Sequence, residues 1–394
     1  MTQPLLDRPV LDPLLPLATY VLLATGTLLP VEAMGGWAAM YLLVVVVFAT
    51  AFLVRAEWGV VAQALGATVC VLGPIFVLYL ISAARTWDMT ITLRRIDGAV
   101  ATTMVAVVLV AAYVARYGEQ AFKAGFIRGA LLILALTLVY KSIFGFFDRD
   151  GRFFINGPIV FGWLMGFCAL TVLQGLIHGA LRSVWLLGFA CFLLAAIWTQ
   201  SKGPLLSIFV TALFLLVVNL GKKRAVSMLG FFVLFACVLV VSLPEEFTRR
   251  FLAIFRVLLG ATDESDYGSV GYRQDAWRDA YQMFMEHPLW GVGVGNWQFL
   301  SRVGEIQYPH NMFLEVGAEM GFPGISMMLA TLGYLFLRSE GWGRLAVGYF
   351  CLCCSFSGDF SYFRFMVAIP LGLLVVDMWS RRRPGGAMTV HARA

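Results

Sequence analysis

Residues 183–220 read SVWLLGFACFLLAAIWTQSKGPLLSIFVTALFLLVVNL and contain a single charged side chain, Lys202. A helix needs roughly 20 predominantly apolar residues to cross the hydrocarbon core of a bilayer. This stretch is long enough for two such helices, joined by the short polar turn at 199–204. The pattern is typical of a protein that crosses a membrane repeatedly.

The same apolar character extends over most of the chain. Hydrophobic residues make up 60% of the 394 residues and charged residues only 13%, against roughly 25% charged in soluble domains. We therefore predict an all-α polytopic integral membrane protein with about twelve transmembrane helices. The expected spans are 12–30, 36–54, 59–83, 97–115, 124–145, 156–177, 183–199, 203–220, 225–243, 311–337, 343–358 and 362–380.

One long polar stretch, 244–309, divides the chain into three parts. We expect nine transmembrane helices in 1–243, and three more in 310–394 before a cytoplasmic tail. The stretch itself holds nine acidic and six basic residues, so it offers no general basic surface for nucleic acid. The net charge of +6 comes instead from short basic clusters between apolar runs, which are typical topology determinants.

Two short helices are expected inside this loop. Residues 244–259 carry an apolar stripe opposed by arginines, a pattern typical of a helix that lies flat on a membrane surface. After a flexible stretch at 261–270, a second helix is expected over 272–286, and Pro288 ends it.

The distribution of Lys and Arg predicts the orientation in the membrane. With both termini inside, 15 of the 29 basic residues fall on the cytoplasmic side, eight in the short outer loops and six in the long loop. This asymmetry favours cytoplasmic termini and an extracytoplasmic 244–309 loop. Eight basic residues in short outer loops exceed what orientation alone favours, so we expect some of them to have another role.

Two clusters suit the binding of an anion. Ser201, Lys202 and Gly203 precede the start of a helix, where free backbone N–H groups and a positive helix end lie beside an ammonium. Arg273 opens the second loop helix, and a guanidinium can hold phosphate oxygens in a bidentate manner. The alternatives are a tight turn with a solvent-seeking lysine and an ordinary solvated arginine.

His310 is the candidate base. It lies where the long loop re-enters the membrane at the head of a helix, and a neutral imidazole suits general-base catalysis near neutral pH. An ordinary pKa predicts a rate that falls below roughly pH 6 to 7. Glu315 is the expected orienting partner and the reserve base, while a structural histidine is the alternative. Gly321 and Pro323 are expected to break the helix that follows.

Three other patterns are less specific. The glycine run at 291–296 lacks the spacing and the βαβ setting of a nucleotide site, so a compact turn with close backbone approach is expected. Asp148 and Asp150 form a D-x-D pattern that could hold a metal, and Cys351, Cys353 and Cys354 cluster in an apolar run. Three charges in a loop often arise by chance, and the cysteines are expected to pack in the core. No metal or other cofactor is predicted.

Four ordered motifs resemble the O-antigen ligase and O-antigen polymerase-like superfamily of bacterial envelope enzymes. They are the Ser-Lys-Gly turn at 201–203, Arg273 with Trp277, His-Pro-Leu-x-Gly-x-Gly at 287–293, and His-Asn-x-x-Leu-Glu at 310–315 followed by Gly-Phe-Pro-Gly. The resemblance covers roughly 199–324, and the rest of the chain matches only as hydrophobic spans.

The resemblance implies an inverting glycosyltransferase of the bacterial inner membrane. Such enzymes take a glycan from undecaprenyl pyrophosphate at the periplasmic face and need neither metal nor nucleotide. Ligases pass the glycan to lipid A–core, whereas polymerases pass it to another repeat unit. The resemblance implies His310 as the catalytic base and Lys202 and Arg273 as pyrophosphate contacts. The family usually has arginine where this chain has Lys202, and lysine keeps the charge but loses the bidentate fork.

Several further contacts and one rival function complete the predictions. Arg152 and Arg364 are additional pyrophosphate candidates, and Trp297, Tyr308, Tyr272 and Trp277 are candidates for stacking on sugars. The expected partners are the lipid-linked donor, the glycan or lipid A–core acceptor and membrane lipid. A transporter or flippase is the rival class, but charges in mid-membrane are scarce and no internal repeat is visible.

Overall fold

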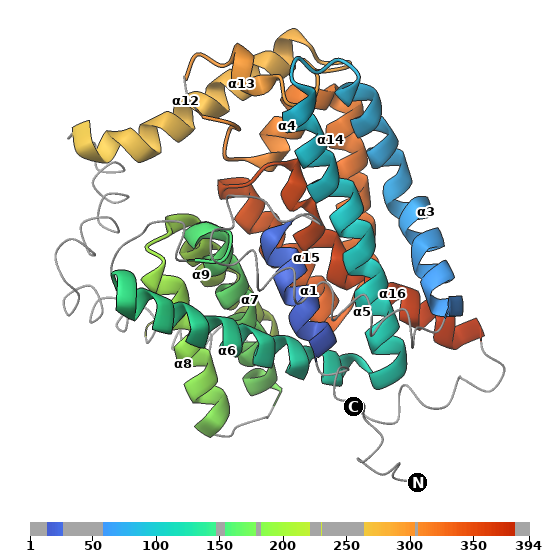
Figure 1. Cartoon of the computed structure of the whole chain (residues 1–394), viewed down its shortest axis with the longest axis vertical. Coiled ribbons are helices and arrows are strands. Elements are labelled where there is room, and N and C mark those ends of the chain that lie inside the picture. Colours follow the sequence, from blue (N-terminus) through green and yellow to red (C-terminus); the bar gives the residue numbers. More distant parts are fainter. Residues whose placement is uncertain are drawn as a thin grey trace.

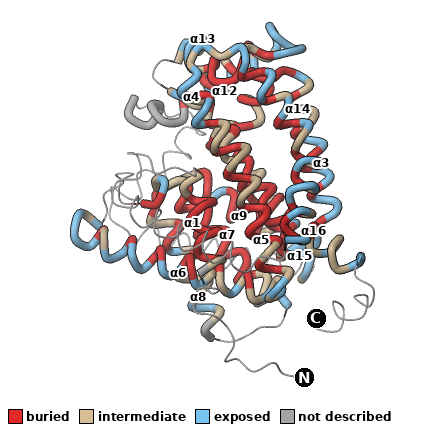
Figure 2. The backbone as a smooth tube through the Cα atoms, turned by 45° about the vertical axis from the view of Figure 1, so that its right-hand side comes forward, coloured by how far each residue is buried: buried red, intermediate tan, exposed pale blue. Residues whose placement is uncertain are grey.

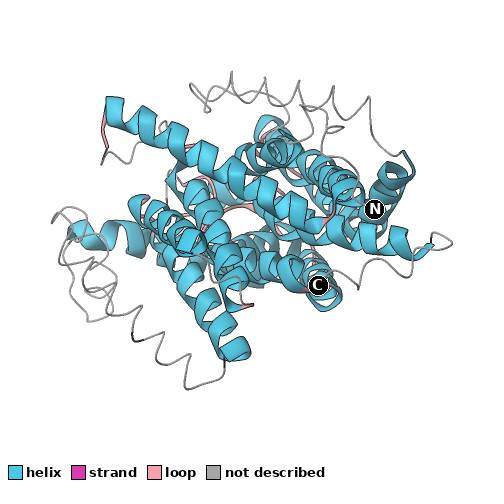
Figure 3. Cartoon of the chain, turned by 90° about the horizontal axis from the view of Figure 1, so that it is seen from below, coloured by secondary structure: helices cyan, strands magenta, loops and turns pink. Residues whose placement is uncertain are grey.

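The computed structural model describes residues 14–26, 58–146, 154–178, 183–220, 264–303 and 306–382, and the single residue Gly230. Over these residues the chain forms helices and no strand (Figures 1 and 3). Seven of the described helices are long and apolar enough to cross a membrane. The prediction of an all-α polytopic membrane protein is therefore confirmed.

Ten of the twelve expected spans coincide with helices of the structure. They are α1 (Leu14–Thr25), α3 (Trp58–Ala83), α5 (Thr102–Tyr117), α6 (Glu119–Phe144), α7 (Gly157–Ile177), α8 (Ser183–Trp198), α9 (Lys202–Leu220), α14 (Met312–Arg338), α15 (Gly341–Phe356) and α16 (Phe363–Arg382). The expected spans at 36–54 and 225–243, and the expected loop helix at 244–259, lie outside the described residues.

Two helices begin eight residues earlier than predicted. The span that leads into α5 starts with α4 (Met89–Ile96), because the Asp88 carboxylate accepts from the backbone N–H groups of Thr90 and Ile91 at 2.8 and 3.2 Å. A π-helical turn, η3 (Asp97–Ala101), joins α4 to α5. In the loop, α12 (Glu264–Glu286) occupies most of the stretch that was expected to be flexible.

The core runs through the middle of the helix bundle, whereas large apolar side chains are exposed on outer faces (Figure 2). Val69 and Val77 of α3 and Val139 and Ile143 of α6 are more than half exposed. Lipid rather than water suits such faces. The helices α12 and α13 (Trp297–Leu300) lie at the end of the bundle where α4 and α14 begin (Figure 1).

The predicted break in α14 is confirmed. Gly321 has φ 67° and ψ −163°, which interrupts the helical backbone at this residue, and Pro323 follows within the same helix. A Cβ at Gly321 would lie 2.7 Å from the carbonyl oxygen of Pro288. The Phe322 N–H donates to that same carbonyl at 2.6 Å. The break therefore lets the long loop approach the helix backbone directly.

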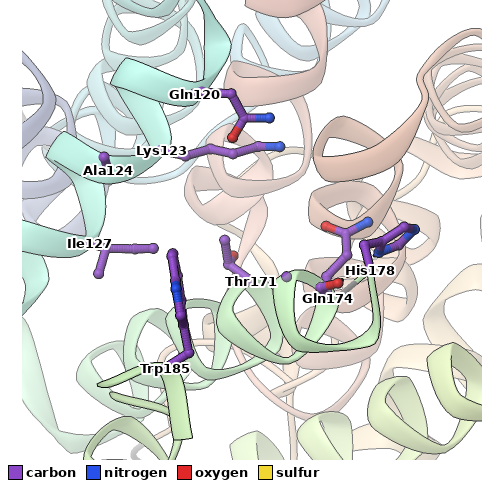
Figure 4. Close-up of a pocket in the computed structure, with 9 residues that line it drawn as sticks. Gln120, Lys123, Ala124, Ile127, Thr171, Gln174, His178 and Trp185 are labelled. Atoms are coloured by element: carbon purple, nitrogen blue, oxygen red, sulfur yellow. Dashed lines mark hydrogen bonds between the residues drawn. The ribbon is translucent and has the colours of Figure 1, made fainter. Parts of the chain in front are cut away.

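One cavity of about 310 Å³ lies between the first turns of α6, the end of α7 and the start of α8 (Figure 4). Its lining includes Gln120 and Lys123 from α6, Gln174 from α7, His178 directly after α7, and Trp185 from α8. These residues lie at the opposite ends of α7 and α8 from the 199–204 turn. The cavity is therefore separate from the residues that the sequence motifs select.

Candidate active site

The glycine run binds the long loop to the break in α14. The N–H groups of Val292 and Gly293 donate to the carbonyl oxygens of Ala318 and Glu319 at 2.8 and 3.0 Å. A Cβ at Gly291 would lie only 2.3 Å from the carbonyl carbon of Glu319. The predicted compact turn with close backbone approach is therefore confirmed, and its role is to dock the loop.

Asn296 fixes the same turn to the connection between α3 and α4. Its side-chain oxygen accepts from the Trp87 N–H at 2.8 Å, and its amide nitrogen donates to the Arg85 carbonyl at 2.9 Å. The Arg85 guanidinium donates in return to the carbonyls of Gly291, at 3.1 Å, and Trp290. Contacts from both directions therefore hold the loop at this end of the bundle.

Gly291→Ala is expected to destabilise the protein by roughly 2–4 kcal/mol, because the new methyl group meets backbone in a left-handed residue. The thermal midpoint in detergent measures this effect. Gly341→Ala is the matched control, since Gly341 also has positive φ but has open space around it. Equal midpoints for the two variants would contradict the docking role of Gly291.

His310 lies two residues before the start of α14 and has a left-handed backbone, with φ 55°. Asn311 caps the helix, accepting from the N–H groups of Phe313 and Leu314 at 3.0 and 3.1 Å. The His310 ring packs against the Tyr308 ring, with centroids 4.6 Å apart. Its Nδ1 is buried and has no hydrogen-bond partner among the described residues. The ring is therefore held in place with one nitrogen that has no hydrogen-bond partner in the described part of the chain.

The surroundings of His310 lower its pKa to about 4. Burial is the largest cause, the Arg273 guanidinium adds to it, and the Asp359 carboxylate opposes both. The imidazole is consequently neutral at pH 7 and stays neutral well below the range that an unperturbed histidine would give. The expected fall in rate below pH 6 to 7 is therefore moved to lower pH in the free protein.

Arg273 comes from α12 and lies in the same group of side chains. Its pKa is lowered by burial, while Tyr308 opposes that shift. Among the described residues, no carboxylate lies within ion-pair distance of Arg273. The Tyr308 hydroxyl, whose pKa is raised by burial, is hydrogen-bonded to Ser357. A partly desolvated cation beside a neutral imidazole is a favourable place for an anionic ligand.

The 199–204 turn borders the same region. Helix α9 begins at Lys202, so Lys202 and Gly203 lie in its first turn and only Ser201 precedes it. The Ser201 side chain is buried, and a Cβ at Gly203 would lie 3.1 Å from Phe356 Cβ. Phe356 is followed directly by the 357–359 segment, in which Ser357 is hydrogen-bonded to Tyr308 and the Asp359 carboxylate acts to raise the pKa of His310. The structure thus places the start of α9 next to the end of α15, directly before the 357–359 segment.

The predicted pairing of Glu315 with His310 is not found. The Glu315 side chain is fully buried, its Oε1 lies 2.9 Å from Arg95 Nη1, and its Oε2 accepts from the Phe360 N–H at 2.8 Å. The carboxylate that acts on the pKa of His310 is that of Asp359, which is not among the residues predicted from the sequence. Its only signal in the sequence is the polar interruption at 357–359 between two apolar spans.

Two other predicted contacts face the protein rather than a ligand. Trp297 is fully buried in a small core with Ala276, Ala280, Met283 and Ala318, so it has no surface to offer a sugar. Arg364 is also buried and donates to the carbonyls of Leu23 at 2.8 Å and Ser361 at 2.5 Å. Both side chains are therefore covered by contacts within the protein and are not open to a ligand.

The remaining candidates stay predictions. Tyr272 is exposed and Trp277 is partly buried on α12, while Arg152 lies outside the described residues, as do Asp148 and Asp150. In the part of the chain that the structure describes, no group of three or more His, Cys, Asp or Glu side chains is placed to hold a metal ion.

Comparison with known proteins points to the same region. A family model described as O-Antigen ligase matches residues 187–329, which include the turn before α9, Arg273 and His310. A curated protein, the probable peptidoglycan glycosyltransferase FtsW of Riesia pediculicola (strain USDA), is 27% identical over 106 residues. That match covers 25% of this chain and 26% of the relative, so the chain spans about a quarter of the relative's length. The resemblance to O-antigen ligases is therefore confirmed over the segment that carries the motifs.

Proposed function

We propose that this membrane protein transfers a glycan from undecaprenyl pyrophosphate to an acceptor hydroxyl, as an O-antigen ligase that acts on lipid A–core. Similarity to O-antigen ligases over 187–329, and to a peptidoglycan glycosyltransferase, supports a membrane glycan transferase. The observation that carries the chemistry is that the Arg273 guanidinium, from α12, acts electrostatically on the buried His310 at the head of α14 and helps to lower its pKa.

In the proposed reaction the acceptor oxygen attacks the anomeric carbon of the donor sugar. The new C–O bond forms as the acceptor proton passes to the neutral His310 imidazole. The bond from the anomeric carbon to pyrophosphate breaks on the opposite face, which inverts the configuration. The pyrophosphate leaves as an anion, stabilised by Arg273, Lys202 and the N–H groups at the start of α9. His310 then returns its proton to water.

Donor binding also strengthens the base. The Arg273 charge is one cause of the low pKa of His310. A pyrophosphate bound at Arg273 would offset that charge, so the pKa of His310 should rise towards its ordinary value in the donor complex. The base therefore accepts a proton more readily when the leaving group is already in place.

We place the site on the periplasmic side of the bacterial inner membrane, with both termini in the cytoplasm. The connections at 84–88, 287–311 and 357–359 meet at one end of the bundle, as the contacts of Arg85 and Glu315 require. The opposite end carries the basic residues in the last turns of α5, α14 and α16, and an excess of Lys and Arg favours the cytoplasm.

Single cysteines test this orientation. A cysteine at Arg278, exposed on α12, is expected to react with a membrane-impermeant thiol reagent in intact spheroplasts. A cysteine at Arg338, at the far end of α14, should react only after the membrane is opened. The unmodified chain serves as the blank. The reverse labelling pattern would place the proposed site in the cytoplasm and rule out a periplasmic reaction.

No divalent metal is expected to be required, because Lys202 and Arg273 supply the positive charge that the leaving pyrophosphate needs. Transfer by the purified protein should therefore continue in excess chelator. Loss of activity that magnesium or manganese restores would contradict this expectation and direct attention to Asp148 and Asp150.

The function itself is tested by transfer in vitro. Purified protein is supplied with undecaprenyl-pyrophosphate-linked glycan and lipid A–core, and the glycosylated acceptor is measured. Extension of a lipid-linked repeat unit, without transfer to lipid A–core, would identify a polymerase instead. Absence of both products with a folded, donor-binding protein would reject the proposed function.

A further inference from the structure

Arg95 of α4 is buried and pairs with two carboxylates of α14. Its Nη1 lies 2.9 Å from Glu315 Oε1, and 3.1 and 3.2 Å from the two oxygens of Glu319. Both glutamate side chains are at most 2% exposed. The glutamates are four residues apart on one helix face, so without a shared cation they would repel each other in a poorly solvated place.

The same guanidinium reaches the two segments that surround His310. Its Nη2 donates to the Gln307 carbonyl at 2.9 Å, three residues before His310. Its Nε lies 3.9 Å from Asp359 Oδ2, and the Asp359 carboxylate acts to raise the pKa of His310. One side chain therefore ties the start of α14, the loop before it and the 357–359 segment together.

The backbone around Arg95 is itself closely packed. The π-helical turn η3 follows Arg95 within two residues. A Cβ at Gly98 in that turn would lie 2.7 Å from Ser361 Cβ and 3.0 Å from the Gly26 carbonyl oxygen. Single π-helical turns often occur at functional sites, where they alter the direction of neighbouring side chains. Here the turn packs against η5 (Phe360–Tyr362), next to Asp359.

We propose that Arg95 is a positioning residue, which acts through Gln307, Glu315 and Asp359 to hold His310 in the geometry needed for transfer. This inference rests on the proposed function. His310 has a left-handed backbone, and the loop before it reaches α4 through the Gln307 carbonyl. Without the guanidinium, the loop and the 357–359 segment would each lose a tie to α4.

The expected effect is on the chemical step rather than on donor binding. The Arg95 charge is offset by Glu315 and Glu319, so it adds little to the field at the pyrophosphate. Misplacement of a catalytic group by about 1 Å can lower the rate roughly 10²-fold. Loss of Arg95 should therefore lower kcat with little change in the donor KM.

The test must avoid leaving two buried carboxylates unpaired, because that alone is strongly destabilising. The decisive variant is therefore Arg95→Met combined with Glu315→Gln and Glu319→Gln, which makes the cluster neutral at similar volume. Arg95→Lys keeps the charge but loses the fork that reaches several partners at once. Arg94→Met is the matched control, since Arg94 is the neighbouring, exposed arginine of α4.

Each variant is purified, its folding is checked by thermal midpoint and donor binding, and kcat, KM and the pH dependence of kcat/KM are measured. For the triple variant we expect kcat to fall roughly 10- to 100-fold, with donor KM within about threefold. Arg95→Lys should lie between it and the unmodified protein, and Arg94→Met should match the unmodified protein.

The pH profile separates positioning from a loss of folded enzyme. Arg273 from α12 and Asp359 from the 357–359 segment set the charge around His310, and Tyr308 packs on its ring. A displaced His310 is no longer exposed to the charge of Arg273, so its pKa should rise. The pH below which kcat/KM falls, the low-pH limb of the profile, should therefore move up from about 4 towards the ordinary value of 6.5. A fall in kcat with an unmoved limb would overturn the inference.

His310→Ala is measured in parallel. If it is inactive while the folded triple variant keeps the kcat and pH limb of the unmodified protein, the Arg95 inference alone is overturned. If His310→Ala transfers glycan normally, His310 is not the base and the Arg95 inference fails with that assignment, whereas only the absence of transfer by the folded, donor-binding unmodified protein rejects the proposed function.

Discussion

His310→Ala is expected to lower glycan transfer by roughly 10²–10⁴-fold, the usual contribution of a general base. The reason is that the acceptor hydroxyl must lose its proton as it attacks, and His310 is the neutral imidazole beside the proposed pyrophosphate contact Arg273. The measurement is transfer from a lipid-linked donor at equal amounts of folded protein. Donor binding should be almost unchanged, because the imidazole is uncharged.

The pH dependence gives a second, independent readout. The base form of His310 is the neutral one, so the rate falls as pH drops through the pKa. In the free protein that pKa is about 4, and kcat/KM should therefore stay flat from pH 7 to about 5. The pH profile of kcat reports the donor complex, in which pyrophosphate offsets the charge of Arg273. The pH below which kcat falls should therefore be higher than the pH below which kcat/KM falls.

His178→Ala is the control for this prediction, because His178 is exposed at the other end of the bundle. It should transfer glycan normally. Near-normal transfer by His310→Ala, at equal expression and folding, would remove His310 from the mechanism. Identical low-pH limbs for kcat and kcat/KM would contradict the proposed coupling between Arg273 and His310.

Arg273→Ala is expected to reduce kcat/KM for the donor roughly 10- to 100-fold, since a charge-assisted contact contributes about 1.5–3 kcal/mol. The same change removes one cause of the low pKa of His310. The low-pH limb of kcat/KM should therefore shift upwards in the variant. This combination of weaker donor use and a moved limb distinguishes loss of the Arg273 charge from general damage.

Arg278→Ala is the matched control on α12, because Arg278 is exposed and pairs only with Asp275 among the described residues. It should affect neither quantity.

Lys202→Ala should also weaken donor use, whereas Lys202→Arg should be tolerated because it keeps the charge and adds a fork. Normal donor use by both Arg273→Ala and Lys202→Ala would reject the phosphate assignment.

Features that depend on neighbours in the chain could be read from the sequence. Apolar runs of transmembrane length predicted ten helices that the structure contains, because each helix satisfies its own backbone groups. The break at Gly321 was also predictable, since a glycine followed two residues later by proline weakens a helix locally. The compact turn at Gly291 followed from glycine's freedom at positive φ in the same way.

Choices between distant partners were decided only by the tertiary structure. Glu315 lies five residues after His310, yet its carboxylate pairs with Arg95, 220 positions earlier. A buried carboxylate needs a cation beside it in space, and distance along the sequence does not decide which one. Trp297 was indistinguishable from an exposed aromatic until α12 and α14 covered it. The pKa of His310 likewise depends on Arg273 and Asp359, which only the folded chain brings to it. The sequence by itself determined the membrane-spanning helices and the residue types available for chemistry, while packing determined which of those residues meet.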